Sequence, residues 1–243
     1  MKRLMSSSSS NEIAVKAIGY IETPFDEKFA VPRQSSLISH GHFEIHFYPP
    51  YDREEAFAGI DGFSHLWISF LFDRNSDDAE FRPMVRPPRL GGNEYKGVFA
   101  TRSPFRPNRL GLSVVRLKKV NNVNGHVSLI VEGADMVNGT PVVDIKPYIC
   151  FVDSVPDAVS GFAPEAPKMQ EVRFMDLALK QIEESGIADF RNLIEEVLAQ
   201  DPRPAYRAGH SDDRMYGVGL CGYDVKWCVK DGVFIVLFLE KAE

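Results

Sequence analysis

Short segments in which apolar and polar residues alternate occupy the first 150 positions of this chain. In residues 42–48 the side chains of Phe43, Ile45 and Phe47 alternate with polar ones, as they do on a half-buried β-strand. The other short apolar runs are separated by turns rich in Gly, Pro and Asn, and no long helical period interrupts them. The pattern predicts strands at 17–21, 42–48, 63–72, 97–100, 113–120, 127–132 and 142–148.

The turns between these segments indicate how the strands are arranged. Asn124-Gly125 and Asn138-Gly139 are typical of hairpin turns, because both residues of such a turn take positive φ angles. An antiparallel sheet rolled into a barrel is the simplest architecture for this pattern. A doubly wound Rossmann fold is not expected, since no Gly-x-Gly-x-x-Gly follows a strand. We therefore expect a mainly β, antiparallel, barrel-like, non-Rossmann domain at residues 13–155.

The periodicity changes after residues 156–168, whose Pro, Ala and Ser content is typical of a linker. Apolar residues recur at helical spacing from Ile187 to Leu198, and this helix is expected to end before Pro202. Residues 169–243 are predicted to form a small α+β domain. Its other expected elements are a helix over 172–182 and a hairpin of strands 225–229 and 233–239. Residues 1–12, basic and then serine-rich, are expected to be a flexible leader.

Composition places the chain among soluble globular proteins. It is 44% hydrophobic and 26% charged, and its apolar runs are far too short to cross a bilayer, so no membrane partner is expected. The three cysteines, at 150, 221 and 228, are sparse and odd in number, which argues against a disulfide framework and fits a reducing cytoplasm. Each is expected to be a small buried apolar residue.

Positive charge is concentrated in residues 82–116, which hold seven arginines, Lys96 and one acid, Glu94. This segment carries a charge of +7 in a chain whose total is −6. The planar guanidinium group suits bidentate contact with phosphate or carboxylate and stacking on bases. The cluster fits an anion-binding surface, for which nucleic acid is the obvious large ligand, and it equally fits a solvated loop.

Histidine is the other concentrated residue type. His40, His42, Glu44 and His46 occur at every second position and so would share one face of a strand. That face is either a set of metal ligands or the solvent side of a half-buried strand. Because four groups in one straight strand rarely converge on an ion, no metal is expected. His65, within an apolar run, is interpreted as a core histidine with a structural hydrogen bond.

Several longer and more specific strings occur together in this chain and in this order. They are FAVPRQSSL (29–37), FSHLWISFLF (63–72), RPPRLGGNEYKGVFATRSPFRPNRLGLS (86–113), NGTPVVDIKPY (138–148) and QDPRPAYR (200–207). Together they resemble the TsaA-like family of the bacterial TrmO (YaeB) type, over nearly the whole chain from Ile18. The resemblance implies S-adenosylmethionine-dependent methylation of N6 of N6-threonylcarbamoyladenosine at tRNA position 37. It also implies a β-barrel-like cofactor domain, a small C-terminal domain and a homodimer.

Carried over position by position, the resemblance implies cofactor contacts in five segments of the chain. The implied residues are Arg33, Gln34, Ser35, Asp73, Arg74, Arg102, Leu112, Asp135, Met136, Val137 and Asn138. The family often has His where this chain has Asp73, and Asp where it has Asn138. At these two positions the contact is therefore left open between side chain and backbone.

The acceptor nitrogen sets the chemical requirement. In the modified adenosine N6 belongs to a urea and is a poor nucleophile, so a base, or donors that stabilise the developing anion, would help. Asp135 and Asp144 are the candidate bases, and Lys146 and Tyr148 are the candidate donors.

The arginines of the basic segment are divided between two ligands. Arg102 is expected at the cofactor. Arg86, Arg89, Arg106 and Arg109 are expected to bind tRNA phosphates or the threonyl carboxylate.

Two other functions remain open at this point. One is a non-catalytic tRNA-binding barrel that stacks bases on Tyr95, Phe99 and Phe105. The other is an S-adenosylmethionine enzyme with a small-molecule acceptor, which the acidic overall charge favours.

Overall fold

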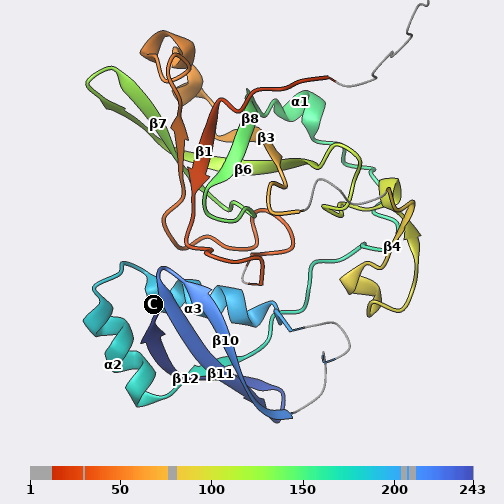
Figure 1. Ribbon diagram of the computed structural model, residues 1–243, viewed down its shortest axis with the longest axis vertical. Coiled ribbons are helices and arrows are strands. Elements are labelled where there is room, and N and C mark those ends of the chain that lie inside the picture. Colours follow the sequence, from red (N-terminus) through yellow and green to blue (C-terminus); the bar gives the residue numbers. More distant parts are fainter. Residues whose placement is uncertain (1–12, 30, 76–80, 204–206, 208–211, 243) are drawn as a thin grey trace, which may run out of the picture.

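The computed structural model describes residues 13–29, 31–75, 81–203, 207 and 212–242 (Figure 1). The expected leader at residues 1–12 lies outside them. The N-terminal part is built around six strands that are hydrogen-bonded in the closed order β1-β2-β7-β6-β3-β8, a closed barrel in which every pair is antiparallel. These strands are β1 (Gly19–Glu22), β2 (Glu44–Phe47), β3 (His65–Leu71), β6 (Leu110–Val123), β7 (His126–Glu132) and β8 (Thr140–Pro147).

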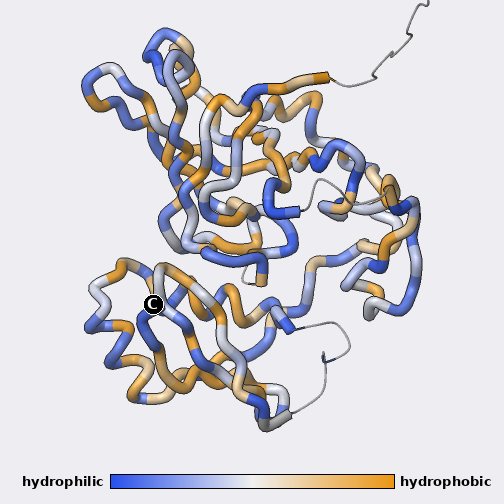
Figure 2. The backbone as a smooth tube through the Cα atoms, in the orientation of Figure 1, coloured by the Kyte–Doolittle hydropathy of each residue, from blue (hydrophilic) through white to orange (hydrophobic). Residues whose placement is uncertain are grey.

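Strand β3 shows how the apolar pattern gives the barrel an inner and an outer face. Leu66, Ile68 and Phe70 are buried, while the residues between them are half-exposed. Strand β3 therefore has one buried and one half-exposed face, as a strand in the wall of a barrel does. Figure 2 shows the same mixture of apolar and polar residues along the strands of both parts of the molecule.

The two Asn-Gly dipeptides behave differently. Asn124 and Gly125 have φ angles of 56° and 86° and join β6 to β7, so this predicted hairpin is confirmed. The turn at Asn138 leads from β7 to β8, and these strands are not neighbours in the barrel, so the prediction of a hairpin there is wrong. Only Gly139 of that pair has a positive φ, 81°. The strand that follows pairs with β1 and β3 instead, because pairing with distant strands decides its place.

An arm projects from the barrel between β3 and β6 (Figure 1). Its short strands are β4 (Met84–Val85) and β5 (Lys96–Gly97), which pair antiparallel. The strand expected at 97–100 is thus largely wrong, since Val98–Ala100 forms a 3₁₀ turn. Pro83, Pro87 and Pro88 lack backbone N–H groups, so the ladder cannot be extended on that side. The other 3₁₀ turns of the N-terminal part are Glu54–Phe57, Ile60–Gly62 and Pro88–Leu90.

The C-terminal part combines a sheet in the order β10-β11-β12-β9 with two helices. A mainly antiparallel molecule with a small mixed C-terminal part is confirmed. The helix predicted from 172 begins later, because residues 172–174 pair parallel with β12 as a strand. The elements are α1 (Cys150–Asp153), before this part, then β9 (Val172–Phe174), α2 (Asp176–Ser185), α3 (Phe190–Ala199), β10 (Asp212–Leu220), β11 (Tyr223–Lys230) and β12 (Val233–Lys241).

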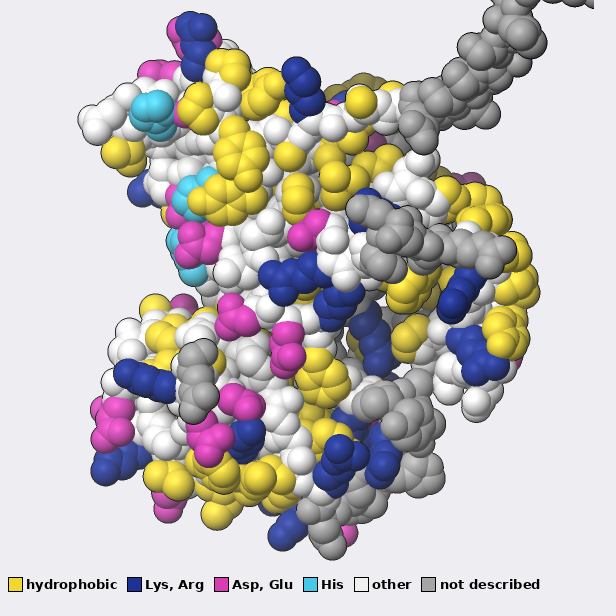
Figure 3. Space-filling model, viewed as in Figure 1, with side chains coloured by type: hydrophobic (Ala, Val, Ile, Leu, Met, Phe, Trp, Pro, Cys, Tyr) yellow, Lys and Arg dark blue, Asp and Glu magenta, His cyan; other side chains and the backbone are white. Residues whose placement is uncertain are grey.

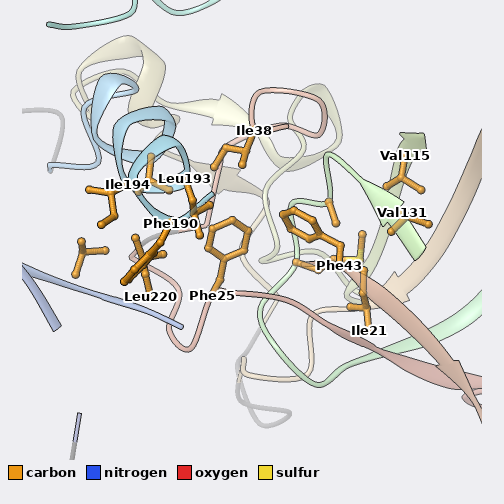
Figure 4. Packing of buried hydrophobic residues seen from close by; sticks show 14 of the residues in the cluster. Ile21, Phe25, Ile38, Phe43, Val115, Val131, Phe190, Leu193, Ile194 and Leu220 are labelled. Carbon is orange, nitrogen blue, oxygen red and sulfur yellow. The ribbon is translucent and has the colours of Figure 1, made fainter. Parts of the chain in front are cut away.

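One hydrophobic core runs through both parts. Residues of the barrel and of the C-terminal sheet and helices belong to the same buried cluster, with Phe25 and Leu193 among its members (Figure 4). The cysteines are not uniformly buried: Cys228 is buried and Cys221 half-buried, while Cys150 is exposed at the start of α1. The prediction of burial is therefore wrong for Cys150. No helix within the described ranges is long and apolar enough to span a membrane.

Candidate functional site

A cavity of about 470 Å³ lies at the barrel, where five separate stretches of chain meet. This volume is within the range of small-molecule sites. The stretches are the loop after β1, the end of β3, the 101–106 turn, the start of β6 and the segment before β8. Its lining comprises Lys28, Val31, Pro32, Arg33, Gln34, Trp67, Phe70, Phe72, Asp73, Arg74, Asn75, Thr101, Arg102, Pro104, Arg106, Leu110, Gly111, Leu112, Ser113, Asp135, Met136, Val137 and Thr140.

Strand β3 supplies an aromatic wall. Trp67 extends from its outer face, and the rings of Phe70 and Phe72 meet edge to face with centroids 5.1 Å apart. Gly111 is paired with Phe70 in the adjacent strand β6, and a Cβ atom on Gly111 would lie 2.2 Å from the Phe70 ring. Glycine is therefore required for this ring to lie across β6. Flat aromatic surfaces of this kind suit a planar ligand group.

Asp135 is the acidic group deepest in the wall. Its Oδ1 atom is buried and has no hydrogen-bond partner within the described part of the chain. Desolvation by burial raises the pKa of the carboxyl group above its usual 3.8, although hydrogen bonds from Ser113 and the backbone and the charge of Arg102 act in the opposite direction. A buried carboxylate oxygen with no partner is costly and is well suited to a cationic ligand group.

Basic side chains border the same cavity, and several are held in place by the backbone. Arg102 donates to Oε1 of Gln34 at 2.6 Å. Arg74 donates to the carbonyl oxygens of Asp26 at 2.8 Å and Asn138 at 2.7 Å, so it ties the loop after β1 to the segment before β8. The cavity thus has a cationic border around an apolar wall and one buried acid.

Most of the predicted cofactor residues meet at this cavity. Nine of the eleven line it, and the two that do not are Ser35 and Asn138. The side-chain oxygen of Asn138 accepts a hydrogen bond from the backbone N–H of Thr23 at 3.2 Å, which gives it a structural contact. Asp73 is exposed at the edge of the cavity.

The predicted catalytic residues are not brought together. Of the four, only Asp135 lines the cavity. Asp144 and Lys146 form an ion pair with each other on β8 and lie opposite Ser69 and Trp67 of β3, so they share the outer face of the sheet with the cavity wall. Tyr148 packs against Trp67, with ring centroids 5.9 Å apart.

The structure describes the side chains of three of the four predicted tRNA-binding arginines, and these do not lie together. Arg86 is exposed on the arm and lies 4.4 Å from the centroid of the Tyr95 ring. Arg106 lines the cavity, with its guanidinium donating to the carbonyl oxygen of Thr101 at 3.0 Å, so it does not belong to a separate surface. Arg109 is half-buried and donates to the carbonyl oxygen of Asn75 at 2.9 Å. The side chain of Arg89 lies outside the described residues.

The histidine run does not form one strand face. His40 precedes β2 and lies 2.9 Å from Glu196 of α3. His42 contacts Glu44, and His46 contacts Glu22. Among the residues that the structure describes, no group of three or more His, Cys, Asp or Glu side chains could hold a metal ion. His65 has a hydrogen-bond partner, Ser64 Oγ at 2.9 Å, as expected. It lies half-buried on the half-exposed face of β3, so the prediction that it is a core residue is wrong.

Several residues of the cavity are missed by sequence reasoning. Trp67 and Phe70 lie in an apolar run that by itself indicates only a buried strand, whereas strict alternation would have put Trp67 on the outer face. Gly111 could have been found from the sequence, because a glycine within a strand often marks a site where another group approaches the backbone closely. Lys28 carried none: it donates to the carbonyl oxygen of Arg74 at 2.5 Å, a contact between segments 46 positions apart.

The fold and the cavity define a mainly antiparallel protein of non-Rossmann type with an aromatic, arginine-bordered cavity at its barrel. The family model of the tRNA-methyltransferase O N-terminal domain matches residues 20–154, and that of the TrmO C-terminal domain matches residues 167–242. The chain belongs to the TrmO family, as its sequence motifs indicated.

Individual relatives agree with this assignment over most of the chain. The tRNA (adenine(37)-N6)-methyltransferase of Escherichia coli (strain K12) is 47% identical, over 92% of this chain and 96% of that protein. A putative S-adenosylmethionine-dependent methyltransferase, RcsF, of Pseudomonas aeruginosa is 44% identical over 88% of this chain and 91% of its own length. The crystal structure of TrmO from Pseudomonas aeruginosa superposes with a TM-score of 0.76 at 37% identity, covering 94% of this chain and 98% of that one.

Proposed function

We propose that this protein is an S-adenosylmethionine-dependent methyltransferase that acts on N6 of adenosine 37 in tRNA, with N6-threonylcarbamoyladenosine as the substrate nucleoside. The observation that carries the proposal is the buried oxygen of Asp135, which has no hydrogen-bond partner among the described residues, in a cavity with an aromatic wall and an arginine border. Membership of the TrmO family supports it, since the Escherichia coli relative that matches nearly the whole chain is named a tRNA (adenine(37)-N6)-methyltransferase.

The residues of the cavity fit the chemical groups of S-adenosylmethionine. Trp67, Phe70 and Phe72 offer flat surfaces for its adenine, and Arg33 or Arg102 can pair with its carboxylate. Asp135 can face one of its two cationic groups, the ammonium or the sulfonium. When bound, the cofactor supplies an electrophilic methyl group, and the task of the protein is to align it with the acceptor nitrogen.

Asp135 is the proposed base among the four catalytic candidates, because it alone lines the cavity. Its raised pKa makes the ionised carboxylate a stronger base toward the N6 proton of the urea. Asp144 and Lys146 form an ion pair beside the aromatic wall of the cavity. Their proposed role is structural: the pair leaves no net charge on the face of the sheet that carries Trp67.

The arginines and aromatics around the cavity are the proposed tRNA surface. Figure 3 shows Lys and Arg side chains gathered where the arm, the barrel and the C-terminal part approach one another. Phe81 and Phe99 are exposed on the arm with ring centroids 6.3 Å apart, which suits base stacking in an anticodon loop. Arg106, at the cavity, is the proposed partner of the threonyl carboxylate, and Arg86, Arg89 and Arg109 those of phosphates.

The remaining features of the proposal concern the whole protein. The proposed division is a cofactor domain at residues 13–155, a linker at 156–168 and a C-terminal domain at 169–243. The enzyme acts as a homodimer in the cytoplasm, where its tRNA substrate is found. Light scattering on the purified protein measures the assembly state, and a mass of one chain at assay concentration would contradict the dimer.

One experiment tests the activity and its alternatives together. The protein is incubated with methyl-labelled S-adenosylmethionine and tRNA from cells that contain or lack the threonylcarbamoyl modification. The expected result is label at position 37 of the modified tRNA alone. Binding of tRNA without transfer would identify a non-catalytic RNA-binding protein, and bound cofactor without transfer to either tRNA would indicate another acceptor.

A further inference from the structure

The loop that connects β1 to β2 lies between the cavity and the C-terminal domain. Its first part is held by the turn between β10 and β11, residues 220–223. The backbone N–H of Cys221 donates to the carbonyl oxygen of Pro24 at 3.0 Å, and that of Gly222 donates to the carboxylate of Asp26 at 3.1 Å. Backbone and carboxylate contacts of this kind fix the direction in which the loop leaves the barrel.

The last part of the loop is held by Glu196 on α3. Its carboxylate accepts hydrogen bonds from the backbone N–H and the hydroxyl of Ser39, at 2.8 and 2.6 Å, and from the backbone N–H of His40 at 3.0 Å. The His40 ring nitrogen lies 2.9 Å away. Burial works against ionisation of Glu196, but the hydrogen bonds from Ser39 and His40 prevail, so its pKa lies below the usual 4.5. One turn later, Gln200 donates to the carbonyl oxygen of Leu37 at 3.3 Å.

Apolar packing joins the same two parts of the loop to the helix. Phe25 and Ile38 are buried to within 1% of full burial and belong to one cluster with Phe190 and Leu193 of α3 (Figure 4). Figure 4 shows Ile38 close to Leu193, and Phe25 between Phe190 and Phe43. The loop is therefore anchored on the C-terminal domain at both ends, by polar contacts over an apolar base.

Between these anchors the loop faces the cavity. Arg33 and Gln34 line it, and Gln34 receives the hydrogen bond from Arg102. The backbone N–H of Ser36 donates to the carbonyl oxygen of Gly133 at 2.9 Å, next to the segment that carries Asp135. One side of the loop thus contacts the proposed cofactor site while its two ends rest on another domain.

We propose that the C-terminal domain positions the cofactor loop, and that Glu196, which does not line the cavity, is a positioning residue for S-adenosylmethionine binding through Ser39 and His40. The inference rests on the proposed assignment of the cavity to that cofactor. It gives the C-terminal domain a function in the methyl-donor site, in addition to any contact that it makes with RNA.

Glu196→Gln is the informative substitution because it preserves size and helix propensity. An amide has one acceptor oxygen and no charge, so it cannot satisfy the donors that the carboxylate satisfies. The loop then spends less time in its binding-competent position, and the apparent Kd rises by the reciprocal of the competent fraction. If that fraction falls to about one tenth, the Kd for S-adenosylmethionine rises about tenfold.

Glu195→Gln is the matched control: it removes the same charge from the neighbouring, exposed position of the same helix. Calorimetry on the full-length variants measures S-adenosylmethionine affinity, and steady-state kinetics measure kcat and both KM values. The expected result for Glu196→Gln is a higher Kd and KM for the cofactor, with kcat at saturation and the KM for tRNA nearly unchanged. Ser39→Ala, which removes one donor, changes the same quantities less, and remains informative if Glu196→Gln does not fold.

Limited trypsin digestion without cofactor gives an independent measure of the loop. Cleavage after Arg33, followed by mass spectrometry, is expected to be faster in Glu196→Gln than in Glu195→Gln. Equal cleavage rates and equal cofactor affinities in the two folded variants would overturn the inference. A fall in kcat and a rise in the KM for tRNA as large as the rise in the cofactor KM would also overturn it. If Glu196→Gln is cleaved faster but the wild-type protein binds no S-adenosylmethionine, Glu196 still positions the loop. In that case the proposed function is refuted.

Discussion

Asp135 is energetically costly to bury, and it is also the residue proposed to contact the cofactor and to act as the base. Its buried oxygen has no partner in the described residues, and its pKa is raised mainly by desolvation. The sequence singled out this residue, but it equally singled out Asp144, which is paired with Lys146 beside the aromatic wall and does not line the cavity. The environment of each carboxylate depends on contacts between distant strands, so the amino-acid sequence alone could not distinguish them.

Replacing Asp135 with Asn is expected to stabilise the free protein at pH 7 and to weaken cofactor binding. Because the folded-state pKa is raised, the folded protein holds the proton more tightly than the unfolded chain, and stability falls as pH rises from about 3.8 through the folded pKa. The Asn side chain does not ionise, so the variant does not lose stability in this way as the pH rises. We expect the Tm of Asp135→Asn to be higher by about 2–4 °C, which is the shift that a stabilisation of about 1 kcal/mol gives in a chain of this size. We expect its affinity for S-adenosylmethionine to be lower by about tenfold, as for the loss of a charged hydrogen bond.

Thermal unfolding between pH 3.5 and 8, with calorimetric titration of S-adenosylmethionine at pH 7, measures both effects. The stability difference between variant and wild type should grow as pH rises above 3.8 and then level off. Asp157→Asn, at an exposed position, serves as the control. A variant that binds the cofactor as tightly as the wild type would contradict the role of Asp135.

At the scale of elements, the paired strands β3 and β6 build the aromatic wall. The apolar runs at 63–72 and 113–120 predicted both strands, and the Asn124-Gly125 turn predicted the β6–β7 hairpin. The placement of Asn138-Gly139 and the short strand β9 were not predictable in the same way, because strand neighbours are chosen by tertiary pairing. Local patterns therefore identify strands more reliably than they identify which strands pair.

Gly111→Ala is expected to destabilise the barrel and distort the wall. The added methyl group would lie 2.2 Å from the Phe70 ring, so the ring or the strand must move. Overpacking of this kind costs about 1–3 kcal/mol. Urea denaturation measures the loss, and cofactor titration measures the distortion. Gly97→Ala is the control, since a methyl group at Gly97 would meet nothing within 4 Å and the φ angle there is negative; an equal effect of the two substitutions would refute the explanation.

At the scale of the whole molecule, the two family domains share one hydrophobic core. The change of periodicity near residue 156 indicated two units, yet it gave no sign that the loop between β1 and β2 packs on α3. The contacts of Ser39 with Glu196 join positions 157 apart in the chain. Such contacts follow from how the folded units meet, and no local pattern encodes them.

We expect the two domains to unfold together, because separating them would expose Phe25, Ile38 and Leu193 to water. The chain has two tryptophans, Trp67 in the barrel and Trp227 in the C-terminal sheet. In Trp67→Phe, the fluorescence of Trp227 and the hydrogen exchange of β7 amides should give the same urea midpoint. Two separate midpoints would show that the domains unfold independently.

The sequence by itself determined the elements with strong periodicity, the polarised arginine segment, the family and fewer than half of the residues that line the cavity. Those features are local, or are carried by motifs that can be recognised in the amino-acid sequence. Only the tertiary structure decided that five separate stretches form one cavity, that Asp135 and not Asp144 lines it, and that Glu196 supports the loop beside it. Burial, register and contacts between domains depend on residues far apart in the chain, and these set the energies of the site.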